Sequence, residues 1–404
     1  MSTSPSAISS PRTETAKELT ATTEHLNATV QDFVTKTEDI NDVVDKAQRR
    51  KIIDAAQKIL DTIKEPGDRW IHFVQETASY TAAKLFYDWG AFEAIPLQES
   101  ISYHELAVFT DTEEALLRRT GGVLVSNGVL KQFGENNVSH THRSLDYRRD
   151  SYVSDTLNMS WTNGFVSYAR YPEYFEKYGR KEPQTINHVT VTFAHGKPEL
   201  GYYEMIEQDP EWLRSFTKGM AHTSSHSPIS GIYDFSWLVS EVEKNPNSDR
   251  AVLVDVGGGK GGAIKAICEE FPGLPPHRFV LEDRPETLEG IEALDEPELV
   301  QVQKVAMDFH KEQPVKGAYT YWVRRCFHNY SDEVSKNMLG IIADAMANDS
   351  RLLVQEDVLD NPPNKMASFM DFMMIGFGGK QRTLESWSRL FNAVGLAYLE
   401  RVKR

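Results

Sequence analysis

A glycine-rich run directly after an apolar segment is the feature that most limits what this chain can fold into. Residues 251–256 (AVLVDV) are apolar except for Asp255, and residues 257–262 (GGGKGG) contain five glycines in six positions. Glycine tolerates positive φ angles and lets a ligand approach the backbone closely. Exposed N–H groups at the start of a following helix favour an anionic group. The pattern therefore predicts a strand, a ligand-binding turn and a helix.

The segments after this run alternate between strand and helix. The apolar patterns predict strands at 279–281, 302–307, 318–323 and 352–354, and helices at 262–270 and 332–347. Such alternation is typical of a parallel sheet with helices on both faces. We therefore expect residues 246–404 to form a Rossmann-like α/β domain.

The first part of the chain has a different character. Residues 1–27 are rich in Ser and Thr and poor in large apolar side chains, so we expect a disordered tail. Residues 28–245 show mainly helical spacing of apolar residues. Within them, residues 100–145 combine two short helices with two extended pieces, as a winged helix does. We expect residues 28–245 to form a mainly helical, winged-helix-like domain.

The composition limits the cellular compartment and the classes of binding partner that we expect. The formal net charge is −15, and the two cysteines, Cys268 and Cys326, sit in apolar runs. Such a surface repels nucleic acid and anionic membranes, and the cysteines fit a reducing compartment. With no visible signal peptide or membrane-spanning run, we expect a cytoplasmic protein. No ligand cluster at metal-binding spacing is visible, so no metal site is predicted. A non-enzymatic winged-helix regulator is an alternative, and it predicts retardation of DNA at moderate salt.

The glycine run alone fits two kinds of cofactor. Gly257, Gly259 and Gly261 satisfy G-x-G-x-G, and the run through Gly262 also satisfies the dinucleotide fingerprint G-x-G-x-x-G. The next strand ends in a carboxylate, Asp283, which is placed for ribose hydroxyls in either case. Because the run begins so late in the chain, little sequence remains for two mononucleotide-binding halves. This favours S-adenosylmethionine, which needs only one half.

Several motifs in a fixed order give a more specific signal. They are FVLEDRP (279–285), DF (308–309), QPVKGA (313–318), VRRCFHNYSD (323–332), LVQEDVL (353–359) and GKQRT (379–383), with GAFEAIP (90–96) and YPEYF (171–175) upstream. Together they resemble the plant and fungal small-molecule O-methyltransferases that use S-adenosylmethionine. The resemblance extends over everything after about residue 65.

The resemblance implies a class I methyltransferase domain preceded by a dimerisation and substrate domain, and hence a homodimer. It implies a small polyketide or phenolic substrate. The residues that match the family's cofactor site are the turn glycines, two carboxylates, an aromatic residue and an arginine: Gly257, Gly259, Gly261, Asp283, Asp308, Phe309 and Arg324.

Methyl transfer to oxygen needs a base close to the acceptor hydroxyl. By the resemblance, His328 in the run His328-Asn329-Tyr330 matches that base, and Glu356 matches the carboxylate that orients it and stabilises its cation. Two positions depart from the family pattern. Asn329 replaces an acid, and Gln381 stands where a second glutamate is usual. A glutamine forms hydrogen bonds but cannot stabilise an imidazolium by charge.

These departures leave a second hypothesis open. Some fungal members of this family act as pericyclases, which catalyse dehydration and cycloaddition or ene reactions of pyridone polyketides without using the methyl group. In such a reaction His328, Arg324 or Thr223 would polarise a substrate carbonyl, together with the sulfonium charge. The retained base and its carboxylate favour methyl transfer, whereas the two departures favour a pericyclase.

Overall fold

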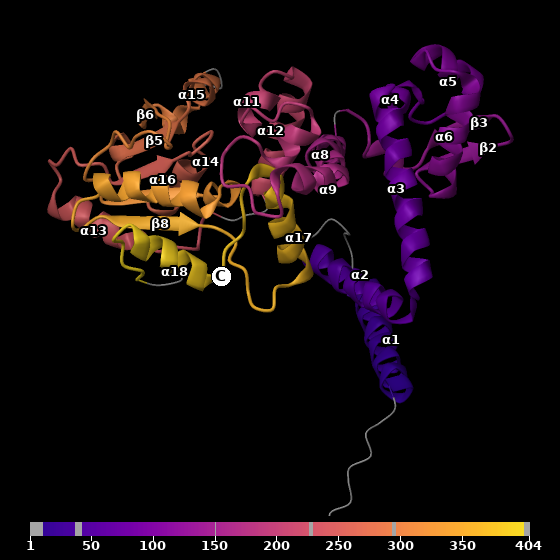
Figure 1. The fold of residues 1–404 in the computed structure, drawn as a ribbon, viewed down its shortest axis with the longest axis horizontal. Helices are drawn as coiled ribbons and strands as arrows, with labels where there is room; N and C mark the ends of the chain where they lie inside the picture. Colours follow the sequence, from indigo (N-terminus) through magenta and orange to yellow (C-terminus); the bar gives the residue numbers. More distant parts are fainter. Residues whose placement is uncertain (1–10, 37–42, 150, 226–228, 293–295, 400–404) are drawn as a thin grey trace, which may run out of the picture. The chain divides into compact units, whose positions relative to one another are not determined.

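The computed structural model describes residues 11–36, 43–149, 151–225, 229–292 and 296–399 (Figure 1). The chain divides into two compact units, Met1–Thr141 and His142–Arg404. The predicted boundary between residues 245 and 246 lies inside the second unit and stays a prediction. Among the described helices, none combines the length and the apolar character needed to cross a bilayer.

Two long helices open the first unit. They are α1 (Pro11–Lys36) and α2 (Val43–Ile63). Glu18 near the start of α1 forms an ion pair of 3.1 Å with Lys58 near the end of α2, so the two helices run antiparallel.

The disordered tail predicted for residues 1–27 is wrong for residues 11–27, which belong to α1; the first ten residues lie outside the described part. Thr22 is buried, and Leu19 and Leu26 on neighbouring turns are half-buried. These residues recur at helical spacing. Pairing with a second helix supplies the burial that this Ser- and Thr-rich segment lacks when it is considered alone.

The rest of the first unit has a winged-helix-like arrangement, as predicted. Its helices are α3 (Pro66–Asp88), α4 (Ala91–Ala94), α5 (Tyr103–Thr110) and α6 (Glu114–Ser126). The strands β1 (Ile101–Ser102), β2 (Leu130–Phe133) and β3 (Asn137–His140) form an antiparallel sheet in the order β1-β3-β2. Arg118 on α6 is held by Glu114 at 2.7 Å and by the side chain of Asn136 at 2.9 Å.

Helices form the first part of the second unit. They are α7 (His142–Leu145), α8 (Tyr152–Ser160), the π-helical turn η1 (Trp161–Phe165), α9 (Val166–Tyr178), α10 (Thr190–Ala194), α11 (Tyr202–Ile206), α12 (Pro210–Ser225) and α13 (Ser236–Lys244). Two buried hydrogen bonds tie α8 and η1 to α12. Asn158 Nδ2 donates to Ser215 Oγ at 3.0 Å, and Trp212 Nε1 donates to Asn163 Oδ1 at 3.2 Å.

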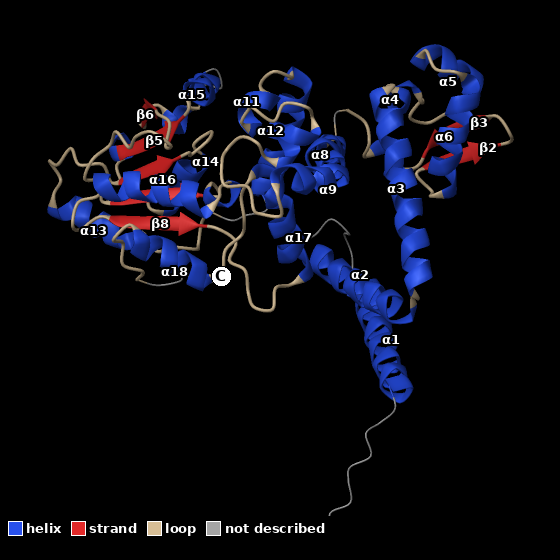
Figure 2. Ribbon diagram, viewed as in Figure 1, coloured by secondary structure: helices blue, strands red, loops and turns tan. Residues whose placement is uncertain are grey.

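A parallel sheet with helices on both faces forms the C-terminal part of the second unit (Figure 2). Its strands are β4 (Leu253–Val256), β5 (Phe279–Asp283), β6 (Gln303–Ala306), β7 (Thr320–Arg324) and β8 (Arg351–Gln355), in the order β6-β5-β4-β7-β8. The helices among and after them are α14 (Gly262–Glu270), α15 (Pro285–Glu292), α16 (Asp332–Ala345), α17 (Lys365–Met374) and α18 (Leu384–Ala393). Because β5 and β7 flank β4 on opposite sides, a crevice for ligands is expected at the carboxyl end of β4.

Successive side chains of each strand point to opposite faces of this sheet. Leu253 and Leu281 pack with residues of α13 and α14 on one face. Val254 and Val280 pack with residues of α16 and α18 on the other. Both faces are buried, which explains the continuous apolar runs in the sequence and confirms the predicted α/β fold.

Candidate cofactor and catalytic site

Strand β4 leads directly into the glycine turn. Gly257, Gly259 and Gly261 have φ angles of +70°, +58° and +72°, the region that favours glycine. A Cβ atom added at Gly257 would lie 3.1 Å from Sγ of Cys326 and 3.3 Å from Cε1 of Phe309. The turn is therefore packed closely against the loops that follow β6 and β7, with room for the backbone alone at position 257.

Asp283 stands at the end of β5, beside the glycine turn. Its Oδ2 accepts a hydrogen bond from the Gly259 N–H at 2.8 Å, and its Oδ1 accepts one from the Arg284 N–H at 2.8 Å. These bonds fix the carboxylate where β5 and the turn meet. Each oxygen keeps further acceptor capacity, which suits a pair of ribose hydroxyls.

The loop after β6 adds a second carboxylate and aromatic rings. Burial alone would raise the pKa of Asp308, but hydrogen bonds from Lys311 and from the His310 N–H lower it below its ordinary value. The Phe309 and His310 ring centroids lie 4.7 Å apart, and Tyr330 lies 5.9 Å from the first and 4.8 Å from the second. The family resemblance implies that Asp308 and Phe309 flank the adenine, and the rings of Tyr330 and His310 lie in the same cluster as Phe309.

Two buried carboxyl groups lie behind the turn, and neither was a predicted site residue. Burial raises the pKa of both Asp255 and Glu282 to about 7. Glu282 Oε2 accepts a hydrogen bond from Gln313 Nε2 at 2.7 Å, while its Oε1 has no hydrogen-bond partner in the described part of the chain. Burial and the neighbouring Arg325 lower the pKa of Arg324, although the charge of Asp255 opposes them.

His328 and Glu356 form a buried pair at the carboxyl ends of β7 and β8. His328 lies on the 3₁₀ turn η4 (Phe327–Asn329), and its Nδ1 is 2.6 Å from Glu356 Oε2. The two side chains are 8% and 2% exposed. Glu356 Oε1 also accepts a hydrogen bond from the Phe327 N–H at 2.8 Å. A carboxylate at Nδ1 holds the proton there and leaves Nε2 as the acceptor.

A buried arginine anchors the loop that carries His328. Arg382 donates to the carbonyl oxygens of Phe327 at 3.0 Å and Tyr330 at 2.8 Å, and its Nε donates to Asp332 Oδ1 at 2.8 Å. The Arg382 side chain is fully buried. At the start of the loop, Arg325 has a φ of +55°, which is rare for a residue other than glycine. The His328 loop is therefore held by backbone contacts on both sides as well as by Glu356.

The segment with Gln381 packs on the same loop. A Cβ atom at Gly379 would overlap the His328 carbonyl oxygen, and the Lys380 N–H donates to that oxygen at 2.9 Å. The Gln381 N–H donates to Asp371 Oδ1 at 2.8 Å. Gln381 is 4% exposed, and its Oε1 has no hydrogen-bond partner among the described residues.

The structure thus gathers most of the predicted site residues around the carboxyl edge of the sheet. The glycine turn, Asp283 and Phe309 lie together, and Arg324 ends β7 directly before the loop with His328. Helix α12 runs through position 223, but the side chain of Thr223 lies outside the described residues. The roles of these residues stay predictions.

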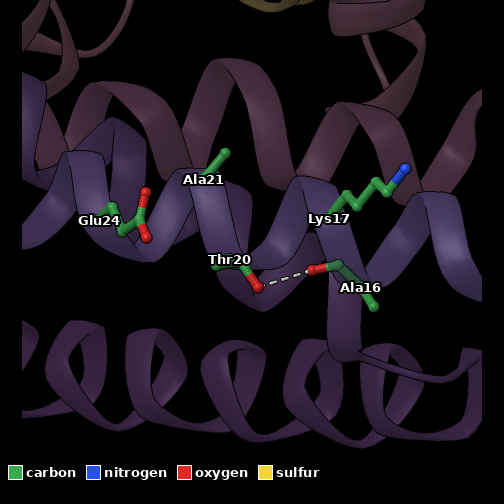
Figure 3. Close-up of a pocket in the computed structure, with 5 residues that line it drawn as sticks. All are labelled: Ala16, Lys17, Thr20, Ala21 and Glu24. Atoms are coloured by element: carbon green, nitrogen blue, oxygen red, sulfur yellow. Dashed lines mark hydrogen bonds between the residues drawn. The ribbon is translucent and has the colours of Figure 1, made fainter.

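A shallow hollow on α1 carries none of the predicted site residues (Figure 3). It is lined by Ala16, Lys17, Thr20, Ala21 and Glu24. The Thr20 hydroxyl donates to the Ala16 carbonyl at 2.9 Å within the same helix.

Comparisons with known proteins agree with this geometry. Residues 182–397 match the sequence profile of the O-methyltransferase domain family. The methyltransferase cfoD of Aspergillus candidus is 34% identical over 358 residues, which cover 87% of this chain and 88% of the relative. The crystal structure of OxaC in complex with sinefungin and meleagrin has a TM-score of 0.80 at 21% identity, covering 96% of this chain and 95% of OxaC. The structure of LepI complexed with SAM has a TM-score of 0.70 at 19% identity, covering 93% and 94%. At such identities the two structures confirm the fold.

Proposed function

Because the chain belongs to the O-methyltransferase family, we propose that it methylates a hydroxyl group of a small aromatic or polyketide substrate, with His328 as the general base. S-adenosylmethionine is its cofactor. The observation that carries the proposal is the buried pair of His328 and Glu356 at 2.6 Å, beside the edge of the sheet where the glycine turn lies.

The residues at that edge fit the cofactor. The turn has room for the backbone alone at Gly257, and the Asp283 carboxylate at its side suits the ribose hydroxyls. Asp308 would accept from the adenine, whose ring would lie against Phe309 and Tyr330. When bound, S-adenosylmethionine supplies an electrophilic methyl group.

The chain's own chemistry is proton transfer. His328 Nε2 accepts the proton of the acceptor hydroxyl as that oxygen becomes nucleophilic, which leaves the imidazole as a cation. Glu356 holds the Nδ1 proton and stabilises this cation, while keeping the ring in one orientation. Because both side chains are nearly buried, little water competes for the proton.

The side chains of helix α17 suit an apolar acceptor molecule. Met366, Phe369 and Phe372 on it are exposed, and the Phe372 ring lies 5.6 Å from Tyr168 and 5.4 Å from Tyr171. Exposed aromatic and methionine side chains of this kind are suited to cover a flat, apolar ligand.

The test uses S-adenosylmethionine with a deuterated methyl group and a panel of phenolic and polyketide acceptors, followed by mass spectrometry. The proposal predicts a labelled product with an equal amount of S-adenosylhomocysteine, and NMR of the product identifies the methylated atom. His328→Ala should abolish the product, whereas the exposed variant Glu385→Gln should leave it unchanged. A His328→Ala protein with wild-type turnover would exclude His328 as the base.

The second candidate is a pericyclase that keeps the methyl group. It is favoured by the uncharged Gln381, whose buried Oε1 has no partner in the described residues, and by Asn329 beside His328. In this case His328 or Arg324 would act as a hydrogen-bond donor to a substrate carbonyl. A product of unchanged mass, or of that mass minus water, would support this candidate if it forms only with the cofactor present and without S-adenosylhomocysteine.

A homodimer formed through the first unit is part of the proposal. Apolar side chains of α3 are about half exposed or more: Trp70 at 65%, Ile71 at 57%, Phe73 at 55% and Val74 at 47%. Contiguous exposed apolar surface of this kind marks an interaction site. Light scattering should give twice the chain mass of 45.8 kDa, and a monomer at micromolar concentration would refute the dimer. A cytoplasmic location is also proposed, because the two cysteines are both free.

A further inference from the structure

Helix α11 and the residue after β5 meet at the edge of the candidate cofactor site, in a contact that the proposed chemistry does not use. Arg284 directly follows Asp283, and its Nη1 lies 2.6 Å from Oε1 of Glu207, the residue after α11. The two side chains are 45% and 38% exposed, so the ion pair is at the surface.

The Tyr203 ring of α11 lies next to this ion pair. The Arg284 guanidinium is 5.7 Å from the centre of the ring, and the other neighbours of the ring include Phe216 at 6.0 Å between centroids. Burial raises the pKa of the Tyr203 hydroxyl, and the nearby Cys326 and Asp283 add to the effect. Because Arg284 directly follows Asp283, its contact with the Tyr203 ring places that ring near the residue that binds the glycine turn.

The strength of the contact suits a reversible closure. An exposed ion pair stabilises by about 0–1 kcal/mol, and salt weakens it further. Such a contact breaks and re-forms easily, and an energy of this size changes a binding constant by up to roughly fivefold. It adds to the affinity of a ligand beneath it without preventing that ligand from leaving.

We propose that Glu207 and Arg284 form a latch that holds Tyr203 over the cofactor site and slows release of the cofactor and its product. The inference rests on the proposed assignment of Asp283 and the glycine turn to the cofactor. Glu207 and Arg284 are positioning residues, because they act through Tyr203 and through the closure of α11.

The test measures binding of S-adenosylhomocysteine by calorimetry and its dissociation rate by stopped flow, with no methyl transfer involved. Glu207→Arg and Arg284→Glu should each weaken binding about threefold to fivefold, mainly through faster dissociation. The double variant, which restores the pair in reversed order, should return to within about twofold of wild type. Glu289→Lys on α15 changes the net charge as Glu207→Arg does, at an exposed site away from the pair, and should bind as wild type does.

Two further measurements separate the latch from the site itself. Added salt should speed dissociation from wild type more than from Arg284→Gln, because only wild type has the ion pair to screen. Asp283→Asn should lose far more affinity than either latch variant. Wild-type affinity in Asp283→Asn would overturn the site assignment and the latch with it. The latch alone would be overturned if Asp283→Asn loses affinity while both single latch variants bind as wild type does. It would also be overturned if Asp283→Asn loses affinity and the double variant shows no recovery.

Discussion

Replacing Glu282 by glutamine should remove a pH-dependent loss of stability from the second unit. The Glu282 carboxyl is fully buried beneath the glycine turn, and its one hydrogen bond inside the described chain comes from Gln313 Nε2. Glutamine has nearly the same shape and keeps an oxygen to accept that bond. The substitution therefore removes the ability to ionise and changes little else.

The magnitude follows from the raised pKa. Burial moves the pKa of Glu282 from 4.5 to about 7, and each tenfold change in proton affinity corresponds to about 1.4 kcal/mol. Below pH 4.5 the carboxyl is protonated in the folded and the unfolded chain, and its full contribution to stability is present. As the pH rises, the unfolded chain ionises first, and about 3 kcal/mol is lost by the time the pH has passed 7. Glu282→Gln has no such loss.

The assay is urea unfolding at pH 5 and pH 8, followed by intrinsic fluorescence. Between these two values wild type should lose roughly 2.5 kcal/mol more than Glu282→Gln, because part of the loss has already occurred at pH 5. Glu289→Gln, an exposed change on α15, should follow wild type. Parallel losses in wild type and Glu282→Gln would show that burial does not hold this carboxyl in its neutral form.

Three other substitutions test the loop that carries the base. Arg382→Ala removes a buried donor from the carbonyl oxygens of Phe327 and Tyr330 and should destabilise the chain by about 1–3 kcal/mol. Arg389→Ala, which removes an exposed side chain of α18, should cost less than about 0.5 kcal/mol in the same unfolding assay. Gly379→Ala should lower both stability and turnover, because the added Cβ would overlap the backbone of the His328 loop. Gly290→Ala, which has open space around it, should lower neither. Equal effects of the two substitutions would contradict the close approach of Gly379 to that loop. Glu356→Gln should lower kcat roughly 10²–10⁴-fold with little change in cofactor affinity, and an unchanged kcat would exclude Glu356 as the partner of the base.

The sequence predicts the sheet well because the physical signal there is strong. Strands buried on both faces read as continuous apolar runs. β4 lies within its predicted range, and β7 extends one residue beyond the predicted end at 323. The predicted helix 262–270 matches α14, because the glycine turn fixes where the helix can begin. The pairing of His328 with Glu356 came from family resemblance, since nothing in spacing alone links residues so far apart.

The contacts that shape the edge of the site could not be predicted in this way. Glu207 and Arg284 come from segments 77 positions apart, and each looks like an ordinary surface charge in the sequence. Glu282 interrupts an apolar run without a visible reason until Gln313 is seen to reach it from the loop after β6. Such pairs depend on how elements pack, which local patterns do not record. For residues 11–27, the missing information was the partner helix.

The anchoring of the His328 loop by Arg382 has a consequence for how the protein is made. Arg382 comes later in the chain than every strand of the sheet, yet it holds the carbonyls on either side of His328. Synthesis proceeds from the amino terminus, and early segments fold first. During translation the strands that carry the glycine turn and Asp283 are complete before the loop with His328 has its anchor. A nascent chain therefore completes the glycine turn first and fixes the His328 loop last.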